Sequence, residues 1–366
     1  MVVDQTKVVD DGLESASESR DNSSRWGWLA AGLFIGFGLA FLLFGFAPLP
    51  TAPAPEADDG VPEVTEAGIG EVVPGFKDGI VAITTSDGRT LDYSIWPVGG
   101  PSYERDVPLG TATTREQVTF DAAGRRIATM HFVPGETFSG LAVGVPEAAR
   151  LVDIGVTGYA WHDSIPGSIA YTTFEDGVLS IWTMDIASSD PELFATVEAD
   201  GGGLAAWGEW GFAIQDQAGQ LVTLLRPDGG EKRSEAGRLL TSHKSGWLVI
   251  FDGEVKLVGA VANNRDFGDR FAVVGEPLTA AISPDGRKLA VLGEAGLLVL
   301  PIEGDSAVVQ AEPRNGVAQI AWSSDNRFVL VPGIRGLTVF DTRGSRLDYV
   351  FGDRTVMGVA VLPVSG

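Results

Sequence analysis

The sequence predicts an all-β fold preceded by one transmembrane α-helix, and three observations carry this prediction. Short apolar stretches separated by glycine- and aspartate-containing turns recur along most of the 366 residues, and no convincing helical stretch follows residue 77. The chain contains 48 glycines and 20 prolines, whereas charged residues make up only 20% of it. Near the N-terminus, no charged residue occurs between Trp26 and Leu49.

The N-terminal part of the chain predicts a tail and a membrane span. Residues 1–25 are polar and acidic and lack apolar periodicity, so we expect a disordered cytoplasmic tail. Residues 26–48 are apolar, and about 20 apolar residues in a helix span the hydrocarbon core of a bilayer. Arg20 and Arg25 precede this span, and no Lys or Arg follows it until Lys77. The positive-inside rule therefore predicts a single-pass protein of the cytoplasmic membrane, with its N-terminus inside and the rest outside.

A cleaved signal peptide is the alternative interpretation of this segment. Residues 52–54, Ala-Pro-Ala, resemble a cleavage site. The acidic leader, the length of the apolar run and Pro55 directly after the site favour an uncleaved anchor. Gly32 and Gly36 lie one helical turn apart and would allow a helix-mediated dimer, although glycine is common in membrane helices.

Residues 49–76 predict a stalk between the membrane and the folded domain. Five prolines and five acidic residues fall within residues 47–66. Such a composition gives a semi-rigid, extended chain of about 3.1 Å per residue. The stalk would hold the following domain away from the bilayer.

A repeat of about forty residues predicts the architecture of residues 77–366. The turn residues Gly246, Gly286 and Asn326 are spaced forty residues apart. Residues 281–290 and 321–329 each contain a short apolar strand, a polar turn tolerant of positive φ, and a second apolar strand. A period of this length, built from short strands, is typical of a β-propeller.

Seven stretches are predicted to be the inner strands of seven blades, because each is short, rich in small apolar residues and followed by a turn. These stretches are residues 115–121, 156–162, 203–208, 238–243, 278–283, 317–323 and 356–362. The last one reaches its turn position where the sequence ends, and the first β stretch, residues 77–83, begins at that same position. The C-terminal strand is therefore predicted to form the inner strand of the N-terminal blade, which closes the ring.

Three stretches resemble known propeller repeats. Residues 283–290, Ser-Pro-Asp-Gly-Arg-Lys-Leu-Ala, resemble the strand-turn-strand motif of TolB-type repeats. Residues 179–185 and 338–342 resemble the third strand of WD40 repeats, and the likeness extends over about residues 77–366. No Gly-His pair and no Trp-Asp dipeptide occurs, so the His–Asp network of WD40 blades is not carried over. The resemblance implies a propeller and a habit of binding proteins, but fold alone does not determine function.

The composition excludes several kinds of chemistry. Cysteine is absent, which excludes disulfides, thiol chemistry and cysteine-ligated metals. The net charge is −23 and no basic patch is present, so nucleic acid is not an expected partner. No nucleophile elbow, phosphate-binding loop or dinucleotide fingerprint occurs. We therefore predict no catalytic residue, no cofactor and no metal site.

Six residues at the ends of inner strands, or in the turns after them, form a predicted partner- or ligand-binding rim. They are Trp161, His162, Trp207, Trp210, His243 and Trp322. Tryptophan suits such a surface because it buries a large area and carries one polar atom. The alternatives are tryptophans packed between sheets and ordinary loop histidines. A metal site formed by the two histidines and Asp163 is a further possibility.

These observations predict a non-catalytic scaffold or sensor in the cell envelope that binds an envelope protein or an extracellular ligand. An extracytoplasmic hydrolase or lyase acting on a glycan or lactone is one alternative, with acidic residues and His162 or His243 near the ring axis. A purely structural subunit of an envelope complex is the other alternative.

Overall fold

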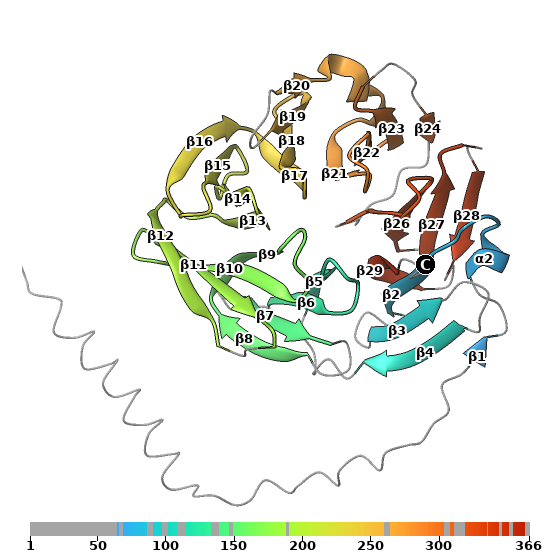
Figure 1. Ribbon diagram of the computed structural model, residues 1–366, viewed down its shortest axis with the longest axis horizontal. Helices are drawn as coiled ribbons and strands as arrows, with labels where there is room; N and C mark the ends of the chain where they lie inside the picture. The colour runs from blue at the N-terminus through green and yellow to red at the C-terminus, as the bar shows by residue number, and fades with distance from the viewer. Residues whose placement is uncertain are drawn as a thin grey trace, which may run out of the picture. The chain divides into compact units, whose positions relative to one another are not determined.

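Seven antiparallel sheets surround one axis in a computed structural model of the chain (Figure 1). The structure describes residues 64–65, 69–85, 91–96, 102–107, 114–132, 139–145, 149–187, 190–259, 264–303, 308–310, 319–334, 336–343, 346–350 and 354–362. The predicted tail (1–25), membrane span (26–48, with Gly32 and Gly36) and first part of the stalk lie outside these residues. Within the described residues, no helix is both long enough and apolar enough to cross a membrane.

Six sheets, here called blades 2 to 7, each contain four consecutive strands. Blade 2 contains β5 (Thr114–Phe120), β6 (Ile127–Phe132), β7 (Ser139–Gly144) and β8 (Arg150–Ile154). Blade 3 contains β9 (Val156–Trp161), β10 (Ser168–Glu175), β11 (Val178–Asp185) and β12 (Glu192–Glu198). Blade 4 contains β13 (Gly203–Gly208), β14 (Gly211–Gln215), β15 (Leu221–Leu225) and β16 (Glu231–Ala236). Blade 5 contains β17 (Arg238–His243), β18 (Trp247–Phe251), β19 (Val255–Gly259) and β20 (Arg265–Asp266), followed by the 3-10 helix η2 (Gly268–Val274). Blade 6 contains β21 (Pro277–Ile282), β22 (Lys288–Gly293), β23 (Gly296–Pro301) and β24 (Val308–Gln310). Blade 7 contains β25 (Ala321–Trp322), β26 (Phe328–Gly333), β27 (Gly336–Asp341) and β28 (Arg346–Val350).

Blade 1 joins the two ends of the domain. Its strand order is β1-β4-β3-β2-β29, and its strands are β1 (Val64–Thr65), β2 (Gly79–Thr85), β3 (Leu91–Trp96), β4 (Ser102–Val107) and β29 (Thr355–Leu362). Strand β29 pairs with β2 along its whole length, from Gly79 opposite Leu362 to Thr85 opposite Thr355. The predicted seven blades and the predicted closure by a C-terminal inner strand are both confirmed.

The domain begins earlier in the chain than the sequence predicts. Strand β1 pairs with the outer strand β4, and the short helix α2 (Ile69–Val72) follows it. Ile69, Val73 and Phe76 are buried in the apolar core between blades 7 and 1. Residues 64–65 and 69–76 therefore belong to the propeller rather than to the stalk, because they pair with its outer strand or pack into its core.

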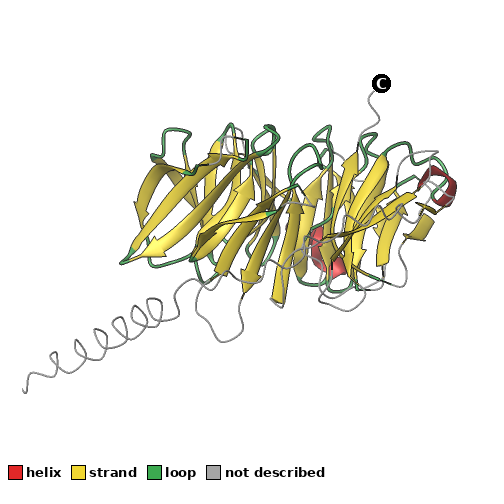
Figure 2. Ribbon diagram, turned by 90° about the horizontal axis from the view of Figure 1, so that it is seen from below, coloured by secondary structure: helices red, strands yellow, loops and turns green. Residues whose placement is uncertain are grey.

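The hairpins between the first and second strands of blades 2 to 7 lie on one face of the ring, here called the turn face. Figure 2 shows the ring from the side, with loops along both faces. Asn326 and Gly286 occupy equivalent turn positions with φ of 59° and 70°. In both turns a serine hydroxyl, from Ser283 or Ser323, donates to an aspartate two residues later, at 2.7 Å. That hydroxyl also accepts the amide that opens the second strand, at 2.9 Å and 2.8 Å. The polar turn residues thus satisfy the backbone of each hairpin.

Asp78 fastens blade 7 to the start of blade 1. Its carboxylate, only 2% exposed, accepts hydrogen bonds from the Ser324 amide at 2.7 Å and the Ser324 hydroxyl at 2.6 Å.

We expect Asp78→Ala to lower the free energy of unfolding by about 1–3 kcal/mol, because two donors lose their acceptor. Urea unfolding measures this change. Ser324→Ala keeps the amide bond and should cost less; equal midpoints for all three proteins would contradict the role of Asp78.

Candidate functional site

The inner strands of blades 3 and 4 approach each other so closely that only glycine fits at two positions of the contact. A Cβ atom at Gly158 would lie 2.6 Å from the carbonyl oxygen of Leu204, and one at Gly203 would collide with the backbone of Thr157. The Leu204 amide donates to Thr172 Oγ1 at 3.0 Å, and the Asp163 amide donates to the Trp207 carbonyl at 3.1 Å. The two inner strands β9 and β13 therefore lie backbone to backbone, which holds the two blades in register.

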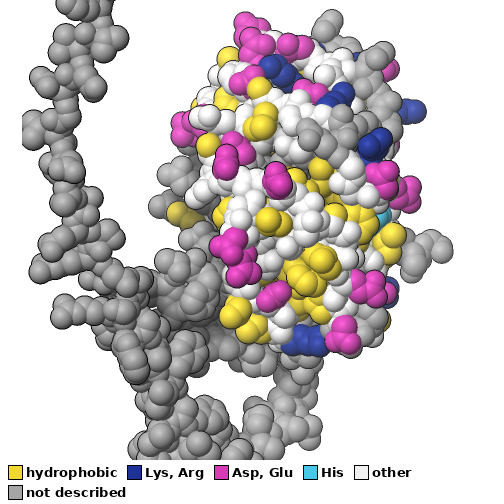
Figure 3. Space-filling model, turned by 90° about the vertical axis from the view of Figure 1, so that its left-hand side faces the viewer, with side chains coloured by type: hydrophobic (Ala, Val, Ile, Leu, Met, Phe, Trp, Pro, Cys, Tyr) yellow, Lys and Arg dark blue, Asp and Glu magenta, His cyan; other side chains and the backbone are white. Residues whose placement is uncertain are grey.

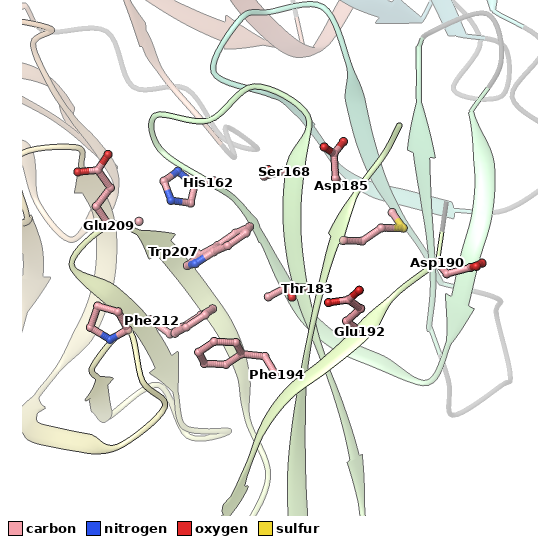
Figure 4. A pocket seen from close by; sticks show the side chains of 13 residues that line it. His162, Ser168, Thr183, Asp185, Asp190, Glu192, Phe194, Trp207, Glu209 and Phe212 are labelled. Carbon is pink, nitrogen blue, oxygen red and sulfur yellow. The ribbon is translucent and has the colours of Figure 1, made fainter. Parts of the chain in front are cut away.

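A cleft of about 510 Å³ opens between these two blades on the turn face, and it is here called the blade 3–4 cleft (Figure 4). Its lining residues are His162, Ser168, Thr183, Met184, Asp185, Asp190, Glu192, Phe194, Trp207, Gly208, Glu209, Phe212 and Pro227. Blade 3 supplies the ends of β11 and β12, and blade 4 supplies the hairpin after β13. The cleft is thus formed by two rigid sheets rather than by a long loop.

Aromatic rings line one wall of the cleft. Trp207 stacks on Phe212 with ring centroids 5.7 Å apart and planes 6° apart. Phe194 packs against Phe212 at 4.7 Å, and the ring of His162 meets Trp207 edge-on at 4.7 Å. Phe194 is 38% exposed and Trp207 is partly exposed, whereas Phe212 is only 2% exposed, so the wall meets solvent mainly at Phe194. Such a surface can stack on planar or cationic groups.

Among the residues that the structure describes, four carboxylates also line the cleft, and no Lys or Arg does. Asp185, Asp190 and Glu192 come from blade 3, and Glu209 comes from blade 4. In Figure 4, Glu209 lies on the His162 side of the view, and the other three lie on the opposite side. A cleft lined by charges of one sign with low-dielectric walls concentrates counter-ions. Its electrostatics therefore favour a positively charged ligand.

His162 is buried beside the cleft and is held by its own turn. Its Nδ1 accepts hydrogen bonds from the amides of Ser164 and Ile165, at 3.2 Å and 3.1 Å, so the proton of the neutral ring sits on Nε2. Burial lowers the pKa of His162 below its usual value of 6.5, and the nearby Asp163 and Glu209 offset part of this shift. The neighbouring Asp163 carboxylate accepts the indole N–H of Trp210 at 3.0 Å, which links blade 3 to blade 4.

The lowered histidine pKa values set a pH dependence of stability. The pKa of His243 is lowered as well, mainly by burial and secondly by the nearby positive charge of Lys244. Because the folded-state pKa of each ring lies below 6.5, the unfolded chain binds more protons as the pH falls below 6.5. The contribution of these rings is complete above pH 6.5 and is lost as the pH falls from 6.5 towards the folded-state pKa. Urea unfolding at several pH values should show this decline, and His162→Asn should make it shallower; identical slopes would contradict the effect.

The six predicted rim residues do not form one surface. His162 and Trp207 line the blade 3–4 cleft, whereas Trp210, only 7% exposed, packs in the apolar core between blades 4 and 5. Trp161, whose indole donates to Thr119 at 3.1 Å, lines a second pocket of about 300 Å³ at the axis of the ring, together with His162. His243, bound through Nδ1 to Ser245, and Trp322, bound through its indole to the Ala281 carbonyl, line neither pocket.

The metal arrangement considered from the sequence is not formed. No group of three or more potential metal-ligating side chains occurs among the residues that the structure describes. His162 and His243 each use Nδ1 to bind the turn that follows them, at positions equivalent to Ser283 and Ser323. Their shared role in the structure is to cap hairpin turns.

Sequence reasoning missed most of the cleft. Phe194 and three of the four cleft carboxylates lie on the outer strands of blade 3 and the loop between them, whereas Trp207 belongs to the inner strand of blade 4. The acidic residues Asp190 and Glu192, beside an apolar Leu-Phe pair, were one available signal. That signal cannot be placed next to Trp207 until the packing of the two blades is known.

Comparison with known proteins supports the fold alone. No protein-family model matches the chain, and no curated protein matches it. A protein from Lactobacillus plantarum has 14% identity and a TM-score of 0.54, with 78% of this chain and 99% of that chain covered. A functionally unknown protein from Desulfotomaculum acetoxidans has 12% identity and a TM-score of 0.52, with 78% and 98% covered. TolB from Acinetobacter baumannii has 12% identity and a TM-score of 0.47, with 81% and 69% covered.

The fold defines the class of protein as a seven-bladed β-propeller. The sheet order establishes this class directly, and the two similar structures with TM-scores of 0.54 and 0.52 agree with it. The likeness of single strands to WD40 repeats and the location in the membrane stay predictions.

Proposed function

We propose that this chain is a non-catalytic binding protein of the cell envelope. In this proposal residues 26–48 anchor it in the cytoplasmic membrane, and the propeller outside binds a partner protein at the blade 3–4 cleft. The observation that carries the proposal is the cleft itself, in which a solvent-open aromatic wall continues onto an exposed apolar edge strand. A concave site of this kind, which combines aromatic rings with polar and charged groups, is typical of a binding surface.

The edge strand β12 extends the surface beyond the cleft. It is the outermost strand of blade 3, so one side of its backbone has no strand partner in the sheet. Leu193 is 53% exposed and Phe194 is 38% exposed. Figure 3 shows hydrophobic side chains gathered on this side of the domain with Asp and Glu side chains around them. Exposed apolar groups with a polar border are a common mark of protein contact.

The state of His162 supports a binding role over a catalytic one. A general base needs a free lone pair, but Nδ1 accepts two turn amides and Nε2 carries the proton in the neutral ring. His243 has the same arrangement, with Nδ1 bound to Ser245. The hydrolase alternative would need these histidines as bases, and their hydrogen bonds disfavour that use.

Site-specific photo-crosslinking in intact cells tests the proposal. A photoreactive phenylalanine replaces Leu193, which lies on the edge strand β12 between the cleft residues Glu192 and Phe194, or, as a matched control, Val273 on η2; the two positions are 53% and 57% exposed. We expect a discrete crosslinked protein at position 193 that is absent at position 273, and we expect the additional change Trp207→Ala to weaken the product. The same products at both positions, or none at position 193, would overturn the proposal.

A further inference from the structure

We infer that the blade 3–4 cleft binds the side chain of an arginine within a peptide segment of the partner. This inference rests on the proposed function and names the chemistry that the site recognises. Three independent properties of the cleft lead to it: carboxylates without ion-pair partners, an aromatic wall with an exposed ring, and an imidazole N–H without a protein acceptor.

Three of the cleft carboxylates have no positively charged side chain of the protein as an ion-pair partner among the described residues. Asp190, Glu192 and Glu209 are exposed, and none has an ion-pair partner among the residues that the structure describes. They line the same cleft from two different blades, and in Figure 4 Glu209 lies on the opposite side of the view from Asp190 and Glu192. A cation placed between them gains attraction from both sides and relieves the repulsion between the carboxylates.

The aromatic wall selects among cations. Phe194 and Trp207 present apolar ring surface to the same space that the carboxylates border. A guanidinium group is planar, is less strongly hydrated than an ammonium, and stacks on aromatic faces while its edges donate to carboxylates. A small, strongly hydrated metal ion would gain nothing from these rings. The combination therefore favours arginine.

His162 supplies the reason to expect a peptide around the arginine. Its side chain is 5% exposed and lines both the cleft and the pocket at the ring axis, and the Nε2 proton has no acceptor among the described residues. A ligand that brings an acceptor to this proton gains a hydrogen bond beside a largely buried ring. The main-chain carbonyl of a bound peptide is such an acceptor, and it lies within a few bonds of the arginine side chain.

Titration with two tripeptide probes tests the inference on the full-length protein. The probes are acetylated and amidated Gly-Arg-Gly and its neutral analogue Gly-citrulline-Gly, which has nearly the same shape. We expect the arginine probe to bind with a Kd between roughly micromolar and millimolar, at least about threefold more tightly than the citrulline probe. We also expect its affinity to fall with added salt. Equal affinities for the two probes, or no binding of either at about 10 mM, would overturn the inference.

A matched pair of double variants localises the effect. Glu192→Gln with Glu209→Gln removes two cleft charges, and we expect it to weaken the arginine probe by about 3- to 10-fold and to leave the citrulline probe unchanged. Glu175→Gln with Glu198→Gln removes the same charge from exposed positions of blade 3 that do not line the cleft. Equal effects of the two double variants would show that only the overall charge matters, which would contradict the site.

The probe titration and the crosslinking experiment fail in different ways. If a partner crosslinks at position 193 but the probes show no preference for arginine, the proposed function stands and the arginine inference is wrong. If the arginine probe binds in the cleft but no protein crosslinks there, the cleft recognises a cation and the proposed protein partner is wrong.

Discussion

Removal of residues 355–366 should unfold the propeller rather than shorten it. Strand β29 is the inner strand of blade 1, and all seven residues of its neighbour β2 are buried. Val356 and Val359 are 4% and 2% exposed, and burial of each contributes about 1.5–3 kcal/mol. Together with the backbone bonds between β2 and β29, this loss is comparable with the whole stability of a typical domain, about 5–15 kcal/mol.

Circular dichroism and urea unfolding of the truncated chain measure this effect. We expect loss of the cooperative unfolding transition and aggregation through the exposed edge of β2. The control is a chain that stops after Leu362, which keeps all eight residues of β29. A soluble truncated chain with the same transition as this control would show that β29 does not close the ring.

The substitution Gly158→Ala should have a large effect for a single methyl group, because the backbone of blade 4 lies directly against this position. The added Cβ would lie 2.6 Å from the oxygen and 2.7 Å from the nitrogen of Leu204, so one backbone must move. We expect a loss of about 3 kcal/mol in the free energy of unfolding, at the upper end of the usual range for overpacking. Separation of β9 from β13 should also widen the blade 3–4 cleft and weaken crosslinking at position 193.

Gly177→Ala is the control for this substitution. Gly177 lies in the hairpin between β10 and β11 of the same blade, and a Cβ there would meet nothing within 4 Å. Its φ of 81° makes alanine mildly strained, at a cost of about 1 kcal/mol. If Gly158→Ala cost no more than Gly177→Ala in urea unfolding, the close approach of the two inner strands would be wrong.

The sequence contains enough local information to predict the ring. Inner strands of a propeller are followed by turns that need a residue tolerant of positive φ, and Gly246, Gly286 and Asn326 mark them at a constant spacing. Closure could be predicted because the last strand and the first share one turn position. The beginning of the domain could not be predicted, because the surrounding prolines and acidic residues are typical of a linker. Within such a segment, Ile69, Val73 and Phe76 are too few to indicate a buried face.

The candidate site could be predicted only in part. The ends of inner strands are recognisable in the sequence, so His162 and Trp207 were identifiable as residues of one face. Whether such a residue is open or buried depends on the neighbouring blade: Trp322 has the same position in its blade but is 6% exposed. The cleft residues opposite Trp207 come from the outer strand of blade 3, and no local sequence pattern predicts that these two segments meet.

Hydrogen exchange of the full-length protein, with and without the partner that crosslinks at position 193, tests the central claim most directly. If the blade 3–4 cleft is the binding site, the partner should protect amides of residues 183–187, 190–194 and 207–212 and leave η2 unchanged. Protection confined to blades 5, 6 and 7, with no change at those three segments, would contradict the assignment of the cleft as the binding site.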